Sequence, residues 1–164
     1  MSADTTRLED LMTYAVEASV RHIESGGLPF VGLLVAADGW VSDPGVNLVR
    51  ETGDPTAHAE IVAIRQAIRA RGAPALVGAT LLATGEPCAM CYRVASAHGI
   101  TAVHFAVDRH TAARCGFDYR AGYTSERTDR LPLAATAQRL AAGRALEPFT
   151  TYIDRHNPDH ITHS

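Results

Sequence analysis

The sequence lacks several features that would assign it to a specialised class of protein. It contains no lysine, so all 15 basic residues are arginine, and the 18 acidic residues give a formal charge of −3. This balance gives no overall attraction to nucleic acid, although it leaves room for a local basic patch. No run of about eighteen apolar residues is present, so we expect no membrane-spanning helix.

Two further absences concern the compartment. The first ten residues lack the basic and apolar segments of a secretory signal, so we expect a cytoplasmic protein. Three cysteines are too few for a disulfide framework: Cys88 and Cys91 form a C-x-x-C pair, and Cys115 stands alone. In a reducing compartment, such a pair favours a metal site or a redox site.

What is present fits an ordinary globular domain. The chain has 164 residues, of which 46% are hydrophobic and 20% are charged. This length and composition predict one domain over residues 1–164, with a core of its own.

Hydrophobic spacing and turn signals divide the chain into alternating helices and strands. We expect helices over residues 8–23, 57–71, 88–98 and 145–156, and strands over 29–37, 40–49, 79–83 and 101–107. Residues 110–115 are expected to form a short helical turn, and residues 116–130 an irregular segment. The strand–helix–strand order after Asp54 favours parallel pairing, whereas the Asp38-Gly39 turn favours a hairpin. Together they predict an α/β/α three-layer domain with a mixed sheet.

Two short motifs carry the candidate chemistry. Residues 56–60 read Thr-Ala-His-Ala-Glu, and residues 86–91 read Glu-Pro-Cys-Ala-Met-Cys. Each motif opens a predicted helix, and the 26 residues between Glu60 and Pro87 allow both helix N-termini to meet at one edge of the sheet. Ligand sites of α/β proteins commonly lie at such an edge.

The residue types in these motifs suit a catalytic zinc ion. Cys88 and Cys91 share a helix face, and the positive end of the helix favours their thiolate forms. His58 adds a nitrogen ligand, and three protein ligands leave the fourth tetrahedral position for water. Glu60 is placed to take a proton from that water as general base and to return it as general acid.

Other interpretations of the same residues remain. A C-x-x-C pair also occurs as a redox dithiol, which needs no histidine partner. A structural zinc site would need a fourth ligand, for which the sequence offers His98, His104 or His110. Near the end of the chain, His156, His160 and His163 are more typical of a solvated tail, because Pro158 interrupts their spacing.

The two motifs together resemble a known signature. H-x-E followed by P-C-x-x-C is the zinc signature of base deaminases. The chain therefore resembles the cytidine deaminase-like superfamily, from about residue 15 to about residue 152. Residues 54–61 (DPTAHAEI) resemble the branch that contains guanine deaminases and tRNA adenosine deaminases, and residues 111–118 (TAARCGFD) are similar to guanine deaminases.

The resemblance implies an architecture and a reaction. The implied fold is a five-stranded mixed sheet between helices, usually in a homodimer, with residues of about 131–164 capping the site or exchanged between subunits. His58, Cys88 and Cys91 match the ligands of one zinc ion per subunit. Glu60 matches the proton shuttle, which assists attack by zinc-bound hydroxide on a ring carbon that carries an amine and releases ammonia.

The resemblance also implies a set of substrate-binding residues. Asn47 matches an asparagine that reads the base, Phe30 matches an aromatic pocket position, and the Ala59 backbone matches a donor. The others follow the last motif: Phe117, Asp118 and Tyr119.

The substrate itself is less sharply implied. The resemblance of residues 111–118 makes a guanine-like purine the first candidate. Tyr119 stands where guanine deaminases carry a second aspartate that reads the amidine edge of guanine, so a cytosine-type or triazine-type ring fits equally well. No glycine-rich phosphate loop is evident, which favours a base or nucleoside over a nucleotide. The alternatives are a tRNA adenosine deaminase and a non-catalytic zinc-stabilised binding module.

Overall fold

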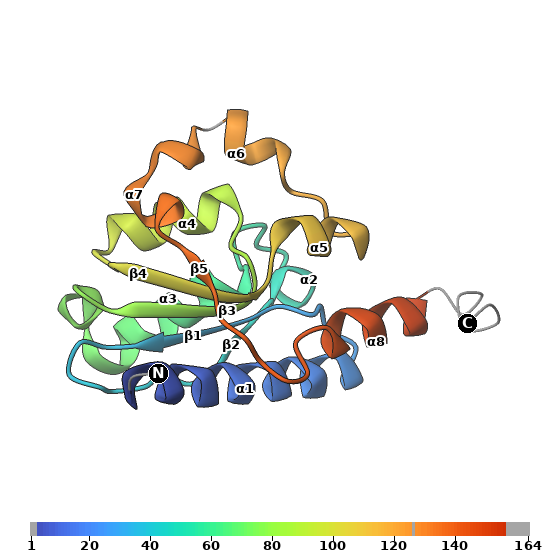
Figure 1. The fold of residues 1–164 in the computed structure, drawn as a ribbon, viewed down its shortest axis with the longest axis horizontal. Helices are drawn as coiled ribbons and strands as arrows, with labels where there is room; N and C mark the ends of the chain where they lie inside the picture. Colours follow the sequence, from blue (N-terminus) through green and yellow to red (C-terminus); the bar gives the residue numbers. More distant parts are fainter. Residues whose placement is uncertain (1–2, 126, 157–164) are drawn as a thin grey trace.

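A computed structural model describes residues 3–125 and 127–156 of the chain (Figure 1). The first half contains, in order, α1 (Ala3–Glu24), β1 (Val31–Val35), β2 (Gly45–Val46), α2 (Val49–Thr52), α3 (Ala59–Arg71) and the 3-10 helix η1 (Ala73–Leu76). The second half contains β3 (Thr80–Gly85), α4 (Ala89–Ala97), β4 (Ala102–Val107), α5 (Arg109–Arg114), α6 (Ala121–Ser125), η2 (Thr128–Arg130), α7 (Pro132–Ala135), β5 (Gln138–Arg139) and α8 (Glu147–His156).

The strands form one mixed sheet in the order β2-β1-β3-β4-β5. β1 pairs antiparallel with both β2 and β3, whereas β3–β4 and β4–β5 are parallel pairs. α4 connects the parallel strands β3 and β4, as the strand–helix–strand order predicted. The predicted five-stranded mixed sheet is therefore confirmed.

Successive strand residues point to opposite sides of the sheet, so both faces carry apolar side chains. Helices cover both faces. Leu34 and Leu81 lie in a buried cluster with residues of α3 and α4, such as Ile64 and Tyr92. Their strand neighbours Leu33 and Leu82 belong to a second cluster, which contains Met12 and Val16 of α1. In Figure 1, α1 and α8 lie on one side of the sheet and α4, α6 and α7 on the other. The predicted α/β/α arrangement is confirmed.

α1 shows the helical spacing that its sequence predicts. Met12, Ala15, Val16, Ser19 and Ile23 recur at three- and four-residue intervals and are buried. The opposite face of the helix carries charged residues. Among the residues that the structure describes, no helix is long and apolar enough to cross a membrane.

The structure corrects two predictions of secondary structure. The returning strand expected over residues 40–49 shrinks to β2, with a single isolated bridge between Val41 and Val35. Pro44 precedes β2 directly, and a proline has no N–H to donate to a strand ladder. The segment 116–130, expected to be irregular, contains α6 and η2.

A candidate metal centre at the N-termini of α3 and α4

α3 presents His58 and Glu60 to the same pocket because His58 lies just outside the helix. His58 is the N-cap residue and has extended backbone angles, φ −65° and ψ 155°. Glu60 is the second residue of the helix. On a regular helix, residues two apart point in nearly opposite directions. The extended cap removes that restriction, so the imidazole and the carboxyl group both line the same pocket.

Two glycines allow the first turns of α3 to lie directly against the sheet. A Cβ atom on Gly45 would lie 2.4 Å from the Ala63 backbone nitrogen and 2.6 Å from the Ala59 carbonyl oxygen. A Cβ atom on Gly32 would lie 3.0 Å from the Glu60 Cα atom. Larger residues at these positions would push the helix away from the strands that hold it.

A polar network fixes the chain just before His58. One oxygen of Asp54, Oδ1, accepts hydrogen bonds from the Thr56 backbone N–H at 2.9 Å and from its hydroxyl at 2.6 Å. Arg65 of α3 donates to Asp54 Oδ2 and to Thr56 Oγ1, each at 3.0 Å. The network thus ties the approach to His58 to the body of the helix.

The turn between β3 and α4 is held in a similar way on the other side of the site. The Tyr119 hydroxyl donates to the Glu86 carbonyl oxygen at 2.5 Å, and the Tyr123 hydroxyl donates to the Pro87 carbonyl oxygen. Glu86 Oε2 accepts the Arg109 backbone N–H at 2.7 Å. Two phenols therefore bind the two consecutive carbonyls that lead into Cys88.

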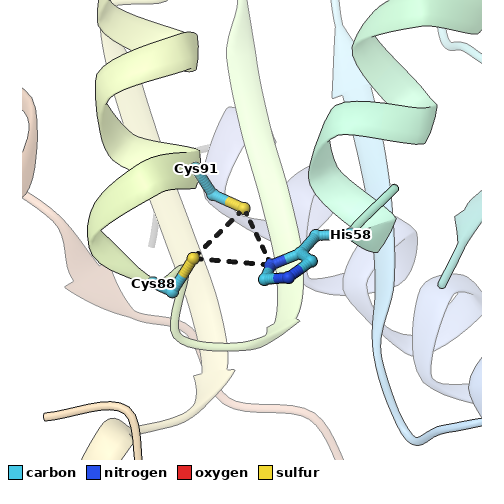
Figure 2. A group of neighbouring side chains, drawn as sticks. All are labelled: His58, Cys88 and Cys91. Carbon is cyan, nitrogen blue, oxygen red and sulfur yellow. Dashed lines mark hydrogen bonds between the residues drawn. The ribbon is translucent and has the colours of Figure 1, made fainter. Parts of the chain in front are cut away.

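Three potential metal ligands converge where the two helices begin (Figure 2). His58 Nδ1 lies 3.5 Å from Cys88 Sγ and 3.6 Å from Cys91 Sγ, and the two sulfur atoms are 3.5 Å apart. Zinc bonds of about 2.3 Å to sulfur and about 2.0 Å to nitrogen, at tetrahedral angles, place neighbouring ligand atoms about 3.5–3.8 Å apart. The triangle therefore fits one zinc ion held by one nitrogen and two sulfur atoms.

The structure also bears on the proposed fourth ligands. Within residues 3–125 and 127–156, the group of side chains able to hold a metal contains His58, Cys88 and Cys91 alone. His98, His104 and His110 do not join it. His160 and His163 lie outside the described residues. The described ligand set therefore has the three-ligand composition of a catalytic zinc site, not the four-ligand composition of a structural one.

The electrostatics of the triad concentrate negative charge on Cys88, whereas hydrogen bonding to Cys88, followed by burial, raises the pKa of Cys91. Hydrogen bonding from Cys91, together with the neighbouring His58, lowers the pKa of Cys88 to about 4. The adjacent Cys88 sulfur, to which it is hydrogen-bonded, raises the pKa of His58 against the opposing effect of burial. Cys88 thus carries the negative charge that a metal ligand needs at neutral pH.

Glu60 lies beside the triad in a different state. Its side chain is only 4% exposed, and Oε2 lies 3.4 Å from Cys91 Sγ. Burial, followed by the nearby negative charge of Cys88, raises the pKa of Glu60 to about 7. A carboxyl group with such a pKa can both accept and release a proton near neutral pH.

The predicted substrate-binding residues line one cavity of about 270 Å³ next to the triad. The cavity is bordered by all six of them, Phe30, Asn47, Ala59, Phe117, Asp118 and Tyr119, and also by His58, Glu60 and Cys88. Cys91 lies behind this wall and is fully buried. A larger cavity, of about 540 Å³, lies between β4, α5, the segment 139–147 and α8, and contains none of these residues.

The polar groups of the cavity are largely engaged. Asn47 Oδ1 accepts the Val49 backbone N–H at 3.1 Å, which leaves the amide N–H groups free to donate. Both carboxylate oxygens of Asp118 accept hydrogen bonds from the Arg120 guanidinium at 2.9 Å. Phe30 and Phe117 form an edge-to-face pair, with ring centroids 5.2 Å apart, and supply apolar wall.

The sequence motifs did not predict two residues of this cavity, Leu28 and Glu86. Glu86 precedes Pro87 in the second motif, and its position two residues before a proposed metal ligand was an available signal. Leu28 follows the Gly26-Gly27 turn and carries no chemical signal of its own. Its place in the wall depends on the path of the chain into β1.

Comparison with known proteins shows which family carries these motifs. Residues 5–107 match the family described as the zinc-binding region of cytidine and deoxycytidylate deaminases. The chain belongs to this family of zinc-dependent aminohydrolases. A guanine deaminase of Bacillus subtilis is 37% identical over 111 residues, which cover 67% of this chain and 70% of the relative. A tRNA-specific adenosine deaminase of Aquifex aeolicus is 39% identical over 83 residues, about half of each chain (51% and 54%).

Solved structures of deaminases share the fold. The crystal structure of the Bacillus subtilis guanine deaminase is 29% identical, has a TM-score of 0.65, and is covered over 95% of its length by 94% of this chain. The guanine deaminase of Nitrosomonas europaea has a TM-score of 0.67 at 20% identity, with 93% of this chain and 85% of that chain covered. The predicted resemblance to the deaminase superfamily and the predicted use of zinc are therefore confirmed.

Proposed function

We propose that this deaminase hydrolyses the exocyclic amine of a small aminated heterocycle, with a guanine-like purine as the first candidate, and releases ammonia. One observation carries the proposal: the buried Glu60 lines the same small cavity as His58 and Cys88, two members of the metal-binding triad. A non-catalytic zinc-stabilised module would have no need for a buried carboxyl group at that place.

Three side chains would hold the metal: His58 through Nδ1, and Cys88 and Cys91 through their sulfur atoms. When bound at such a site, zinc lowers the pKa of a water molecule to about 7 and so supplies hydroxide at neutral pH. In the proposed reaction, a carbon–oxygen bond to the ring carbon forms and the carbon–nitrogen bond to the amine breaks. Water supplies the oxygen, and ammonia is the leaving group.

Glu60 moves the protons of this reaction. Its carboxylate accepts one proton from the attacking water and passes it to a ring nitrogen. After the carbon–oxygen bond has formed, the carboxylate accepts the second proton of that water and passes it to the departing amine. A pKa of about 7 suits both directions of transfer. Because Glu60 is only 4% exposed, bulk water stays away from the carboxyl group during these steps.

The remaining cavity residues orient the ring. The free Asn47 amide N–H groups suit an acceptor on the substrate, such as a carbonyl oxygen or a ring nitrogen. The Ala59 N–H, at the start of α3, adds a second donor at the positive end of the helix. Phe30 and Phe117 supply apolar wall for a planar ring. These contacts place the amine-bearing carbon next to Glu60 and the metal ligands.

The size of the cavity favours a free base. A volume of about 270 Å³ lies below the 300–1,000 Å³ that is usual for drug-sized ligands. The relatives include both a guanine deaminase and tRNA-specific adenosine deaminases, so RNA is the main competing substrate. The formal charge of −3 and the absence of lysine favour the small molecule.

The test is ammonia release by the zinc-loaded protein from a panel of guanine, adenine, cytosine, an aminotriazine, their nucleosides and an anticodon stem-loop. We expect at least one free base to be a substrate and the stem-loop not to be. Glu60→Gln is the matched variant, because it keeps the size of the side chain but cannot carry the proton. We expect it to retain zinc and to lose at least about 10²-fold in kcat. Turnover of the stem-loop alone, or unchanged turnover by Glu60→Gln, would refute the proposal.

Several wider predictions accompany this function. We propose that residues 1–164 act as one domain, in the cytoplasm, and that two chains form a homodimer. Exchange of the segment 131–164 between subunits stays a prediction, and residues 157–164 lie outside the described part of the chain. Sedimentation equilibrium of the purified protein would measure the number of chains in the assembly.

A further inference from the structure

Two tyrosines, Tyr119 and Tyr123, form the same kind of hydrogen bond to the turn before Cys88, but only one of them lines the cavity. Tyr119 and Tyr123 stack with ring centroids 6.4 Å apart, and each donates its hydroxyl to a backbone carbonyl of the turn. Tyr119 and its acceptor residue Glu86 both line the substrate cavity. Neither Tyr123 nor its acceptor residue Pro87 borders that cavity. One of the two hydrogen bonds therefore joins two residues of the cavity wall.

The bond from Tyr119 engages an acceptor that the cavity could otherwise offer to a ligand. A backbone carbonyl next to the metal ligands is a natural partner for an amine N–H. In the structure, this oxygen already accepts from a phenol at 2.5 Å. Burial raises the pKa of Tyr119, so its hydroxyl keeps its proton and remains a donor.

Side-chain acceptors of the cavity are engaged as well, including Glu86 Oε1, which lies 3.8 Å from the Arg109 guanidinium. Asn47 Oδ1 accepts from Val49, Glu86 Oε2 accepts from Arg109, and both oxygens of Asp118 accept from Arg120. Glu60 is required for proton transfer. A substrate with a second exocyclic amine would bring two further N–H groups into this cavity. Buried donors without a partner weaken binding strongly, which is how hydrogen-bonding sites reject near-identical ligands.

We propose that Tyr119 is a specificity-determining residue, whose hydrogen bond to the Glu86 carbonyl makes the cavity prefer heterocycles with one exocyclic amine over those with two. The inference rests on the proposed function and specifies its substrate class. It also assigns Tyr119 a role that its hydroxyl fulfils without touching the substrate: the phenol removes an acceptor from the cavity, while its ring supplies apolar wall.

Adenine and 2,6-diaminopurine test this preference, because they share one amine and differ by a second. Their dissociation constants are measured by calorimetry with zinc-loaded protein carrying Glu60→Gln, so that neither ligand is consumed. We expect adenine to bind more tightly. Adding Tyr119→Phe removes the phenol donor and exposes the Glu86 carbonyl. The ratio of the two dissociation constants should then shift in favour of 2,6-diaminopurine by about fivefold or more, which is the effect on affinity expected from one additional hydrogen bond.

Tyr123→Phe is the matched control, because it removes the equivalent hydrogen bond from Pro87 outside the cavity. It should leave the affinity ratio within about twofold, since no cavity acceptor changes. If Tyr119→Phe fails to fold, Tyr119→Leu exposes the same carbonyl and carries the same expectation. An unchanged ratio in the Tyr119 variants, an equal shift in Tyr123→Phe, or no binding of either purine would overturn the inference. Failure of the proposed function would be seen separately, as no ammonia release from any base by the protein with Glu60 intact.

Discussion

Asp54 and Glu60 are carboxylic acids six positions apart, and their surroundings give them opposite behaviour. Hydrogen bonds from Thr56, followed by Arg65, lower the pKa of Asp54 to about 2, so it is a permanent anion near neutral pH. Burial and the charge of Cys88 raise the pKa of Glu60 to about 7. The sequence alone marks both as acidic, and only their contacts separate an anchoring anion from a proton-transfer group.

The anchoring role of Asp54 predicts an effect on metal binding. Asp54→Ala removes the acceptor of Thr56 and the ion-pair partner of Arg65, and so loosens the chain that carries His58. We expect zinc affinity to fall by about tenfold, the lower end of the range for residues that support metal ligands from behind. Competition with a fluorescent zinc chelator measures the affinity.

Asp38 offers a matched control for that change. Its carboxylate forms an ion pair with Arg71 at 2.9 Å, similar to the Asp54–Arg65 pair at 3.0 Å, but Asp38 lies outside the metal site. Asp38→Ala should leave zinc affinity unchanged. An equal loss of affinity in both variants would show that Asp54 acts through general stability rather than through His58.

At the scale of elements, the site depends on where α3 and α4 begin. His58 and Cys88 are both N-cap residues with extended backbone angles, and each follows a loop held by side-chain hydrogen bonds. The sequence predicted two helix N-termini at one sheet edge, because each motif follows a turn and precedes a helical pattern. It did not predict how tightly α3 lies on β1 and β2, since that distance depends on the absent side chains of Gly32 and Gly45.

Gly45→Ala tests that close approach. The added methyl group would meet the α3 backbone at 2.4 Å, so the N-terminal half of the helix must move. We expect unfolding free energy to fall by about 1–3 kcal/mol, the usual cost of overpacking, together with reduced zinc retention. Urea unfolding and the zinc content of the purified protein are the measurements.

Gly143→Ala is the control for this substitution, because nothing lies within 4 Å of the position of its added methyl group. We expect it to keep both stability and zinc content. If Gly45→Ala behaves in the same way, the helix is not held by this contact and the positioning argument is wrong.

At the scale of the whole molecule, the cavity joins three segments that are far apart in the sequence: residues 28–60, 86–88 and 117–119. The sequence predicted the residues with distinctive chemistry, such as His58 and Cys88, because motif spacing is local. It predicted less well the segment 116–130, where polar composition indicated an irregular chain but α6 and η2 form. The bonds from Tyr119 and Tyr123 to the turn at 86–87 span more than thirty residues, and no local pattern reveals such contacts.

The contacts of the C-terminal helix were likewise not predictable from local sequence patterns. Phe149 of α8 is fully buried and lies edge-on to Phe30 and Phe117, at ring-centroid distances of 5.6 Å and 6.2 Å. The helical pattern predicted α8 but not what it covers. Because Phe149 packs against Phe30 and Phe117, which both line the cavity, α8 stabilises the apolar wall of the substrate site.

The central claim is that a zinc ion held by His58, Cys88 and Cys91 drives amine hydrolysis in the adjoining cavity. The most direct test measures ammonia release from the best base of the panel before chelation, after removal of the metal, and after addition of one equivalent of zinc per chain. We predict loss of at least about 10²-fold on removal and full recovery at one equivalent. Turnover that survives complete removal of the metal would contradict the account.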